Sequence, residues 1–575
     1  TVAILEQNEV DFDVVRFKAE RRETPSLRYL VDGDFVQAPV VKKMTDLSVL
    51  PSPHLSGISD KFYDDLLIPM MQTTRGCPYQ CTFCWEGGSF FTKIKRFPQD
   101  RVHAEINYIA ERIGTTVPDF MITDANFGMF KEDMETASEI LKTQKSHENQ
   151  WPRTIMAATA KNHKERTIEI VKLLGDTLPP TAAVQSTDIN VLSEIKRKNV
   201  SLDALVSLAQ HVDTQGGQSE AEIILGIPTD TREAHFRSVS DMLDAGMTFI
   251  RMYQFMMLPG TASSSSKSRE RHNIETRYRV LPRCFGRYKF RGEVFSSAEI
   301  EEISVANNTL PYQHYQDCRD LNLTVEIFHN DSIFSEIAQL LSKYGIERSE
   351  WLRVVYDIIL NENDVLAKLY ADYRAEEKKN LWMRLVDVEK FVQEPGVIER
   401  YIDAEYGTNE LYKYRALAVF EHLDTLHSIA FESARRLLDK AGVLDQRIGD
   451  YMGELSRFSN LRKQDVLNTD HVLRDRFHYD FISILESKYT VDPFDFHHPD
   501  GIEIELFHTD SQKSLIAGYI VQYTTTLIGL GRILLRANMN RLYRRAHALD
   551  GDGNIMPRPS IAADIDSADY PRLVG

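Results

Sequence analysis

Short apolar runs alternate with longer amphipathic segments between about residue 66 and residue 262. Six of these runs have the length and composition of buried strands, and apolar residues recur at helical spacing between them. The strand-like runs are LLIPMMQTT, DFMITDANF, RTIMAATA, TAAVQSTD, SEAEIILGIP and TFIRMYQFMML. Helices are expected over residues 101–113, 131–145, 164–175, 189–197, 201–212 and 231–245.

This alternation predicts an α/β fold, because successive strand–helix units form a parallel sheet covered by helices. Six units fit an open, partial (β/α)6 barrel of the TIM type better than a closed barrel of eight units. In such barrels the chemistry lies at the carboxyl ends of the strands. We therefore assign residues 66–262 to a partial barrel.

The regions outside the barrel differ from it in composition. Residues 1–65 form a lead-in segment or linker with a hairpin expected around Asp32–Gly33, and they are a candidate remnant of a missing N-terminal domain. Residues 263–330 are serine-rich and basic, which favours a solvated loop over an entrance for an anionic substrate.

The last part of the chain divides into two regions. Long amphipathic runs predict a mainly α-helical domain over residues 331–548. Within it, RANMNRLYRRAHAL has the pattern of an amphipathic helix. Residues 549–575 have the composition of a disordered tail.

Composition narrows the class of protein. The chain has 575 residues, 42% of them hydrophobic, and a formal net charge of −17, which argues against nucleic acid or anionic lipid as a partner. The N-terminus lacks the basic and apolar pattern of a signal peptide. The apolar stretch Leu515–Leu535 contains Gln522 and Arg532, so we expect a buried helix, no membrane contact and a cytoplasmic protein.

Three of the five cysteines fall within eight positions, in TRGCPYQCTFCWEG. Cys77, Cys81 and Cys84 are spaced C-x3-C-x2-C directly after the first predicted strand, and soft thiolates can each hold one iron of a [4Fe–4S] cluster. Zinc is the alternative, but structural zinc takes four ligands and no second pair follows. Cys284 and Cys318 are expected to be buried packing residues.

The cysteine segment, together with Phe83 before its last cysteine, resembles the signature of the radical S-adenosylmethionine (SAM) superfamily. The resemblance covers about residues 66–262. It implies that SAM chelates the fourth, open iron of the cluster through its amino and carboxylate groups. An external one-electron donor of the flavodoxin or ferredoxin type then drives reductive cleavage of SAM to a 5′-deoxyadenosyl radical.

Strand ends match weaker motifs of the same superfamily. Asp124 and Asn126, in TDANFG, resemble the polar groups that receive the SAM amino end, although Asp and Asn also favour ordinary turns. Gln185 and Ser186, in VQSTDINVLSEIKRKN, resemble the stretch that approaches the ribose or carboxylate. Arg197 corresponds to a group on the carboxylate, and its alternative is a solvated helix face.

The fifth predicted strand ends in EIILGIPTDTRE, which resembles the segment that passes beside the adenine. Gly226, Ile227 and Pro228 would lie against the base, and Gly226 would allow close approach of the backbone. Glu222 lies within this strand and either points into the barrel or has a structural partner.

The residues before the barrel, VDGDFVQAPVVKKMTDLSVLPSP, look like the linker between a cobalamin domain and a radical SAM core. The cobalamin signature D-x-H-x-x-G does not occur in these 575 residues. The leading hypothesis is a cobalamin-associated radical SAM methyltransferase that acts on a small molecule or natural-product intermediate. Alternatives are sulfur insertion of the methylthiotransferase kind and a non-catalytic scaffold or maturation partner.

Overall fold

The computed structural model describes most of the chain. The described residues are 14–39, 45–63, 67–114, 117–147, 150–160, 164–178, 181–199, 201–203, 205–207, 209, 219–403, 405–406 and 409–556. The helix predicted over 201–212 lies largely outside them, as does most of the predicted tail over 549–575. The hairpin expected at Asp32–Gly33 is confirmed, because β1 (Arg28–Val31) pairs with β2 (Asp34–Gln37) in antiparallel register.

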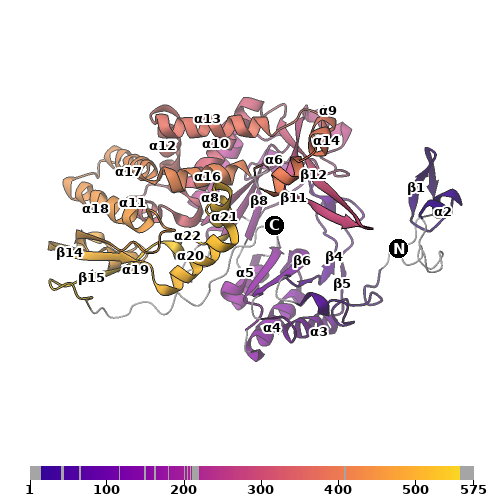
Figure 1. The fold of residues 1–575 in the computed structure, drawn as a ribbon, viewed down its shortest axis with the longest axis horizontal. Helices are drawn as coiled ribbons and strands as arrows, with labels where there is room; N and C mark the ends of the chain where they lie inside the picture. Colours follow the sequence, from indigo (N-terminus) through magenta and orange to yellow (C-terminus); the bar gives the residue numbers. More distant parts are fainter. Residues whose placement is uncertain are drawn as a thin grey trace.

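Each of the six apolar runs contains a strand, and the strands form two parallel sheets of three. The first sheet has the order β3 (Met70–Met71), β6 (Asp119–Phe127) and β7 (Thr154–Thr159). Helices α3 (Gln99–Ala110), α4 (Lys131–Ser146) and α5 (Lys164–Leu174) pack beside it (Figure 1). These strands and helices bury a hydrophobic core of their own.

The second parallel sheet has the order β8 (Thr181–Gln185), β9 (Glu220–Leu225) and β10 (Phe249–Gln254). Its helices are α6 (Ile189–Glu194) and α8 (Arg232–Asp244). The threonine hydroxyl of Thr231 caps α8 by accepting a hydrogen bond from the Ala234 amide at 3.0 Å. The outward residues of this sheet join the large hydrophobic core of the C-terminal helices, so the sheet and the helices share one core.

The two sheets meet between β7 and β8. The side chain of Thr159 donates a hydrogen bond to the carbonyl oxygen of Thr181 at 2.9 Å. The predicted strand order is therefore present as two half-sheets side by side, with a mixed α/β content.

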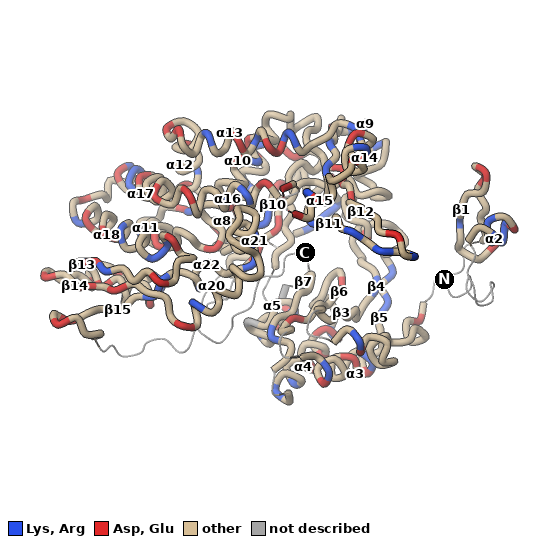
Figure 2. The backbone as a smooth tube through the Cα atoms, in the orientation of Figure 1, with Lys and Arg blue, Asp and Glu red and all other residues tan. Residues whose placement is uncertain are grey.

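The segment after β10 corrects the sequence interpretation. It was expected to be a solvated loop, but it forms α9 (Ser266–His272) and a long hairpin of β11 (Glu275–Phe290) and β12 (Glu293–Ala306). The base of the hairpin bonds to the end of β10, because the Ser304 amide donates to Phe255 O at 2.9 Å. Lys and Arg residues follow the outer half of β11 (Figure 2), which explains why the sequence reads as solvated.

The C-terminal region is mainly helical, and Figure 1 shows its helices packed beside the second sheet. The central helix α10 (Tyr312–Phe328) is buried on nearly every side from Cys318 onward. The other helices are α11 (Ser335–Lys343), α12 (Arg348–Asn361), α13 (Asp364–Lys379), α14 (Leu385–Gln393), α15 (Val397–Ile402), α16 (Glu410–Glu421), α17 (Leu423–Lys440), α18 (Gln446–Lys463), α19 (Phe481–Glu486), α20 (Asp510–Tyr523), α21 (Leu527–Arg536) and α22 (Met539–Leu542).

A small antiparallel sheet within this region was not predicted. It has the order β13 (Leu473–Tyr479), β14 (His497–Phe507) and β15 (Arg545–Leu549). The basic segment expected to be one amphipathic helix contributes only α22 and then β15, because Ala548 and Leu549 pair with β14 and are buried there.

The single helix expected over Leu515–Leu535 is two helices, α20 and α21. They are separated at Thr524, which has a positive φ of 66°. Among the described residues, no helix has the length and hydropathy needed to cross a membrane.

Candidate functional site

The three clustered cysteines lie on a loop that two glycines make possible. The loop follows β4 (Thr74–Arg75), and Gly76 has a φ of +104°, where an added Cβ would lie 2.5 Å from the Phe91 carbonyl oxygen. A Cβ on Gly87 would lie 2.0 Å from the carbonyl oxygen of Cys81. Any side chain at either position would displace backbone, so both glycines fix the path of the loop.

A buried carboxylate holds the strand that leads into the loop. Asp124, 2% exposed on β6, accepts hydrogen bonds from the backbone amides of Thr73 at 2.7 Å and Thr74 at 3.1 Å. The two threonine hydroxyls donate to the same carboxylate. Burial raises the pKa of Asp124, and these four donors oppose the rise. These hydrogen bonds make Asp124 an anchor for the loop. The expected contact of Asp124 with the SAM amino end stays a prediction.

The other side of the loop is attached to the second sheet. The Thr82 amide donates to the carbonyl oxygen of Ile195 at 3.1 Å, and the Ser263 amide donates to Thr82 O at 2.9 Å. The indole of Trp85 lies against Gly260, where an added Cβ would be 2.6 Å from the ring. The cysteine loop therefore joins the two half-sheets.

The three loop thiols form no disulfide. Cys77 and Cys81 are buried and Cys84 is partly buried. Cys318 is buried as expected, whereas Cys284 lies exposed on the β11–β12 hairpin, which corrects the prediction that it packs in a core. Among the described residues, no three His, Cys, Asp or Glu side chains converge closely enough to hold a single metal ion.

Two polar side chains from different half-sheets reach the thiols. The amide of Asn126, at the end of β6, donates to the sulfur of Cys77 at 3.2 Å. The guanidinium of Arg197 comes from the segment after α6 and is 5% exposed. Burial lowers the pKa of Arg197, while nearby Cys81, Glu222 and Cys84 oppose that change, which places this cation beside the thiols.

Asn199 fixes the position of Arg197. Its side-chain oxygen accepts a hydrogen bond from Arg197 Nε at 2.8 Å, and its side-chain nitrogen donates to the carbonyl oxygens of Val184 and Ser186, both at 2.8 Å. Arg197 is thus tied to the end of β8, and the solvated helix face considered for it is wrong, because it is almost fully buried.

Two buried polar atoms next to the thiols have no hydrogen-bond partner. They are Nη1 of Arg197 and Oδ1 of Asn126. Unsatisfied buried groups are costly and point to a missing ligand. A donor from Arg197 and an acceptor from Asn126 match a ligand that carries both a carboxylate and an amine, and thiolates suit iron. The residues present therefore fit a [4Fe–4S] cluster with SAM.

The remaining predicted residues lie around this centre in different ways. Gln185 ends β8 with a positive φ of 66° at a break in the register with β9. Ser186 turns toward α8, where its hydroxyl lies 3.3 Å from that of Ser238. Phe83 packs against a small core that contains Ile195 and Ile227.

The predicted adenine segment is buried at the end of β9. Gly226 has a φ of +86°, and its amide donates to Asp230 at 3.2 Å. Asn307, from the segment after β12, donates to the Ile227 carbonyl oxygen at 3.2 Å, and Pro228 is buried beside it. Burial raises the pKa of Asp230 to about 7.

Polar side chains line the inner face of the second sheet. Residues alternate along β9, so that Ala221 and Ile223 pack outward in the helical core while Glu222 lies on the opposite, partly exposed face. Tyr253 on β10 is 45% exposed. Burial raises the pKa of Tyr253, and the negative charge of Glu222 raises it further. The Tyr253 side chain is therefore surrounded by protein yet open to water.

Sequence reasoning missed several residues that build this site. Thr73 and Thr74 directly precede the cysteine loop, and their hydroxyls were a signal for a buried acceptor. Asn199 lies two positions after Arg197, a spacing that allows a side-chain bond. The contact of Trp85 with Gly260 joins residues that are far apart in sequence, so no local pattern indicates it.

No protein-family model matches the chain. The chain is 28% identical over 357 residues to the cobalamin-dependent radical SAM methyltransferase TokK of Streptomyces tokunonensis. The matched region covers 59% of this chain and 50% of TokK. It is 29% identical over 290 residues to the 2-(S-pantetheinyl)-carbapenam-3-carboxylate methyltransferase of Streptantibioticus cattleyicolor. This second matched region covers 49% of this chain and 41% of that enzyme.

Among solved structures, the cobalamin-dependent SAM radical enzyme OxsB, with aqua-cobalamin and SAM bound, matches at a TM-score of 0.38 and 12% identity. That match covers 80% of this chain and 66% of OxsB. The chain spans half or less of the length of the two curated relatives described above. The predicted resemblance to cobalamin-associated members of the radical SAM superfamily is confirmed by TokK, whose name states both properties.

Proposed function

We propose that this chain carries the radical SAM core of a cobalamin-dependent methyltransferase that acts on a small-molecule, natural-product intermediate. The observation that carries the proposal is that three cysteines outside any disulfide share one loop, beside the unsatisfied atoms of Asn126 and Arg197. Both curated relatives are named as methyltransferases, and one of them is named for a carbapenam carboxylate substrate.

Cys77, Cys81 and Cys84 would hold the cluster, which when bound supplies one electron and an open iron site to SAM. Arg197, held by Asn199, presents its free Nη1 to the carboxylate of SAM. Asn126 offers an acceptor to the amine while its nitrogen stays on Cys77. Gly226 leaves the backbone after β9 open to a flat ring.

The substrate would lie on the inner face of the second sheet, next to Glu222 and Tyr253. These side chains offer a carboxylate and a phenol that can orient a polar molecule. Cobalamin would serve as the methyl carrier. A flavodoxin- or ferredoxin-type protein would supply electrons, and the oxygen-sensitive cluster suits a cytoplasmic setting.

The test is an anaerobic assay of the purified chain. The protein is reconstituted with iron, sulfide and hydroxocobalamin, reduced with dithionite, and supplied with SAM. We expect about four irons per chain, with 5′-deoxyadenosine and S-adenosylhomocysteine detected by mass spectrometry.

The Cys84→Ser variant should lose both products, and Cys284→Ser provides a matched control because Cys284 lies exposed and outside the loop. Equal turnover by wild type and Cys84→Ser would refute the cluster assignment. 5′-Deoxyadenosine without S-adenosylhomocysteine or bound cobalamin would support the radical SAM core and refute a cobalamin site within this chain.

A further inference from the structure

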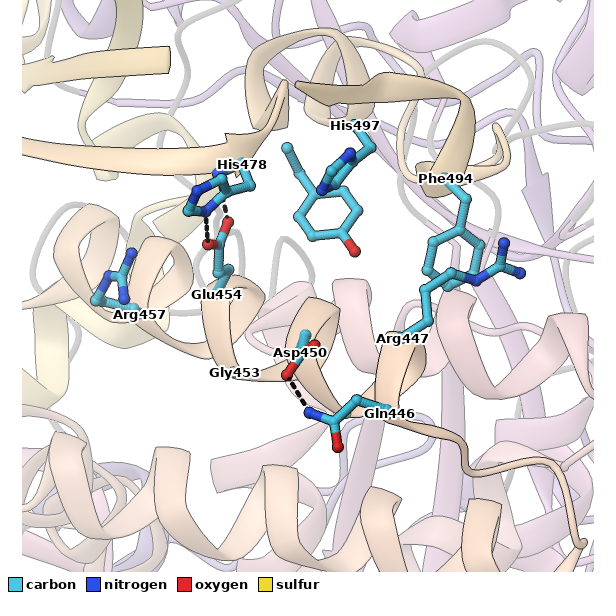
Figure 3. A pocket seen from close by; sticks show the side chains of 11 residues that line it. Gln446, Arg447, Asp450, Gly453, Glu454, Arg457, His478, Phe494 and His497 are labelled. Carbon is cyan, nitrogen blue, oxygen red and sulfur yellow. Dashed lines mark hydrogen bonds and ion pairs between the residues drawn. The ribbon is translucent and has the colours of Figure 1, made fainter. Parts of the chain in front are cut away.

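A cavity of about 970 Å³ lies in the C-terminal region, between α18 and the ends of β13 and β14 (Figure 3). In Figure 1 these elements lie on the opposite side of the molecule from β4, where the cysteine loop begins. Cavities of this volume hold whole small-molecule ligands. The lining residues are Gln446, Arg447, Gly449, Asp450, Gly453, Glu454, Arg457, His478, Tyr479, Phe494 and His497.

The helix side of the cavity is open down to its backbone. Gly449 and Gly453 are one turn apart on α18, and a Cβ added to either would meet nothing within 4 Å. Interior glycines destabilise a helix relative to alanine. Asp450 and Glu454 follow these glycines directly, so carboxylates flank the open surface.

The sheet side of the cavity is an aromatic wall that carries one hydroxyl. Tyr479 is 4% exposed, and its ring lies edge-on to Phe494 at 6.3 Å and to His497 at 5.1 Å between centroids. The Tyr479 hydroxyl makes no hydrogen bond among the described residues, and it is not one of the buried unsatisfied atoms, so it is open to water in the cavity. Burial and the nearby carboxylates raise the pKa of Tyr479, which keeps this group a donor.

A cation lies at the edge of the same wall. The guanidinium of Arg447 stacks over the Phe494 ring at 3.9 Å. In the described part of the chain it makes no ion pair or hydrogen bond, so its donors are available to a ligand at this edge. Glu454, in contrast, already accepts bonds from the backbone amide and the ring nitrogen of His478, both at 2.7 Å (Figure 3).

We propose that this cavity is a second ligand site that binds an anionic heteroaromatic molecule of the mononucleotide type. An aromatic wall suits a flat base, and base–aromatic stacking is favourable for every base. Asp450 can accept from an exocyclic amine, while the Tyr479 hydroxyl donates to a ring nitrogen. Arg447 matches a phosphate, which arginine binds through paired donors.

The experiment titrates the full chain with adenosine 5′-monophosphate (AMP) by isothermal calorimetry, and saturation-transfer NMR identifies the ligand protons that touch protein. Adenosine and ribose 5-phosphate separate the base from the phosphate. We expect AMP to bind with a Kd below about 1 mM and each fragment to bind at least about tenfold more weakly.

Three variants locate the binding. Gly453→Leu fills the cavity and should weaken AMP binding at least about tenfold. Gly518→Leu is the matched control, because Gly518 is also exposed on a helix, α20, with nothing within 4 Å. Arg447→Gln should weaken AMP but leave the weaker binding of adenosine unchanged.

Two results would overturn the proposal. One is no heat and no saturation transfer with AMP up to about 5 mM. The other is AMP binding that is unchanged in Gly453→Leu, because the nucleotide would then bind elsewhere. Binding of this kind that SAM displaces counts in the same way. Neither result bears on the methyltransferase assignment, because the cavity contains no residue of the cysteine site.

Discussion

Asn126 donates its side-chain amide to the sulfur of Cys77 at 3.2 Å, across 49 positions of sequence. The donor ends a strand of the first sheet, and the acceptor opens the cysteine loop. Hydrogen bonds to cluster sulfurs tune reduction potential, because they stabilise the more negative, reduced form. This single contact therefore links the end of β6 to the electronic properties of the proposed cluster.

Replacing Asn126 with leucine should lower the reduction potential of the reconstituted cluster, since the thiolate loses a donor. The potential can be followed by the electron paramagnetic resonance signal during a redox titration. Asn361→Leu, on the exposed end of α12, is the control. An unchanged potential in Asn126→Leu would mean that the bond to Cys77 is absent in the loaded protein.

Replacing Arg197 with glutamine should raise the KM for SAM about 10- to 100-fold, because a charge-assisted hydrogen bond contributes about 1.5–3 kcal/mol. Iron content should stay at the wild-type level, since Arg197 is not expected to ligate iron. Arg237→Gln removes an exposed arginine of α8 that is 3.3 Å from Asp188 and should change neither quantity. A wild-type KM in Arg197→Gln would remove this residue from the SAM site.

Replacing Asp124 with asparagine should lower the free energy of unfolding by about 3 kcal/mol, because the new amide group would face donors from Thr73 and Thr74. Urea unfolding measures this loss. As a control, Asp372→Asn removes one partner of an exposed ion pair and should lower the free energy of unfolding by less than about 0.5 kcal/mol. If Asp124→Asn instead unfolds like wild type and only SAM binding weakens, the four-donor anchor is not its main role.

Sequence pattern was sufficient for the cysteine loop and the strand order, because both depend on local signals. The C-x3-C-x2-C spacing is contiguous, and each strand is a compact apolar run. It failed for β11 and β15, whose basic residues hide the strand pattern. Both strands form because distant partners, β12 and β14, supply the hydrogen bonds, and local propensity cannot indicate such pairing.

In the candidate site, too, a local motif indicates some residues, whereas only the fold brings the others together. Arg197 was identified from a motif, but its burial and its tie to Asn199 depend on how β8 ends. The cavity at α18 was not predicted at all, since it is formed by Gly453 and Tyr479 from elements that pair only in the fold.

The contact of Trp85 with Gly260 gives a test of the junction between the half-sheets. Gly260→Ala places a Cβ 2.6 Å from the indole at a φ of +85°. Gly345→Ala shares the unfavourable backbone, with a φ of +70°, but meets nothing within 4 Å. We expect Gly345→Ala to cost about 1 kcal/mol and Gly260→Ala about 1–3 kcal/mol more.

Urea unfolding gives the difference between these two variants, and iron content after reconstitution reports on the loop. A lower iron yield is expected for Gly260→Ala alone. Equal costs for both variants would show that Trp85 moves away freely and does not fix the cysteine loop.

A buried histidine makes the free energy of unfolding depend on pH, and substitution of His235 on α8 measures this effect for one residue. Burial is the main cause that lowers the pKa of His235 to about 4, with its ring bonded to Asn322 at 2.8 Å. The unfolded chain, with the histidine near its ordinary value of about 6.5, then binds more protons than the folded chain between pH 6.5 and 4. Stability from this group is therefore full above pH 6.5 and is lost as the pH falls through that window.

The measurement compares wild type with His235→Gln by urea unfolding at pH 7 and pH 5. The comparison is needed because Asp230, with a pKa raised to about 7, changes stability in the opposite direction over the same range. Wild type should lose about 2 kcal/mol more than His235→Gln between these pH values. Equal losses in the two proteins would mean that the imidazole of His235 is protonated in the folded state, which its burial between α8 and α10 argues against.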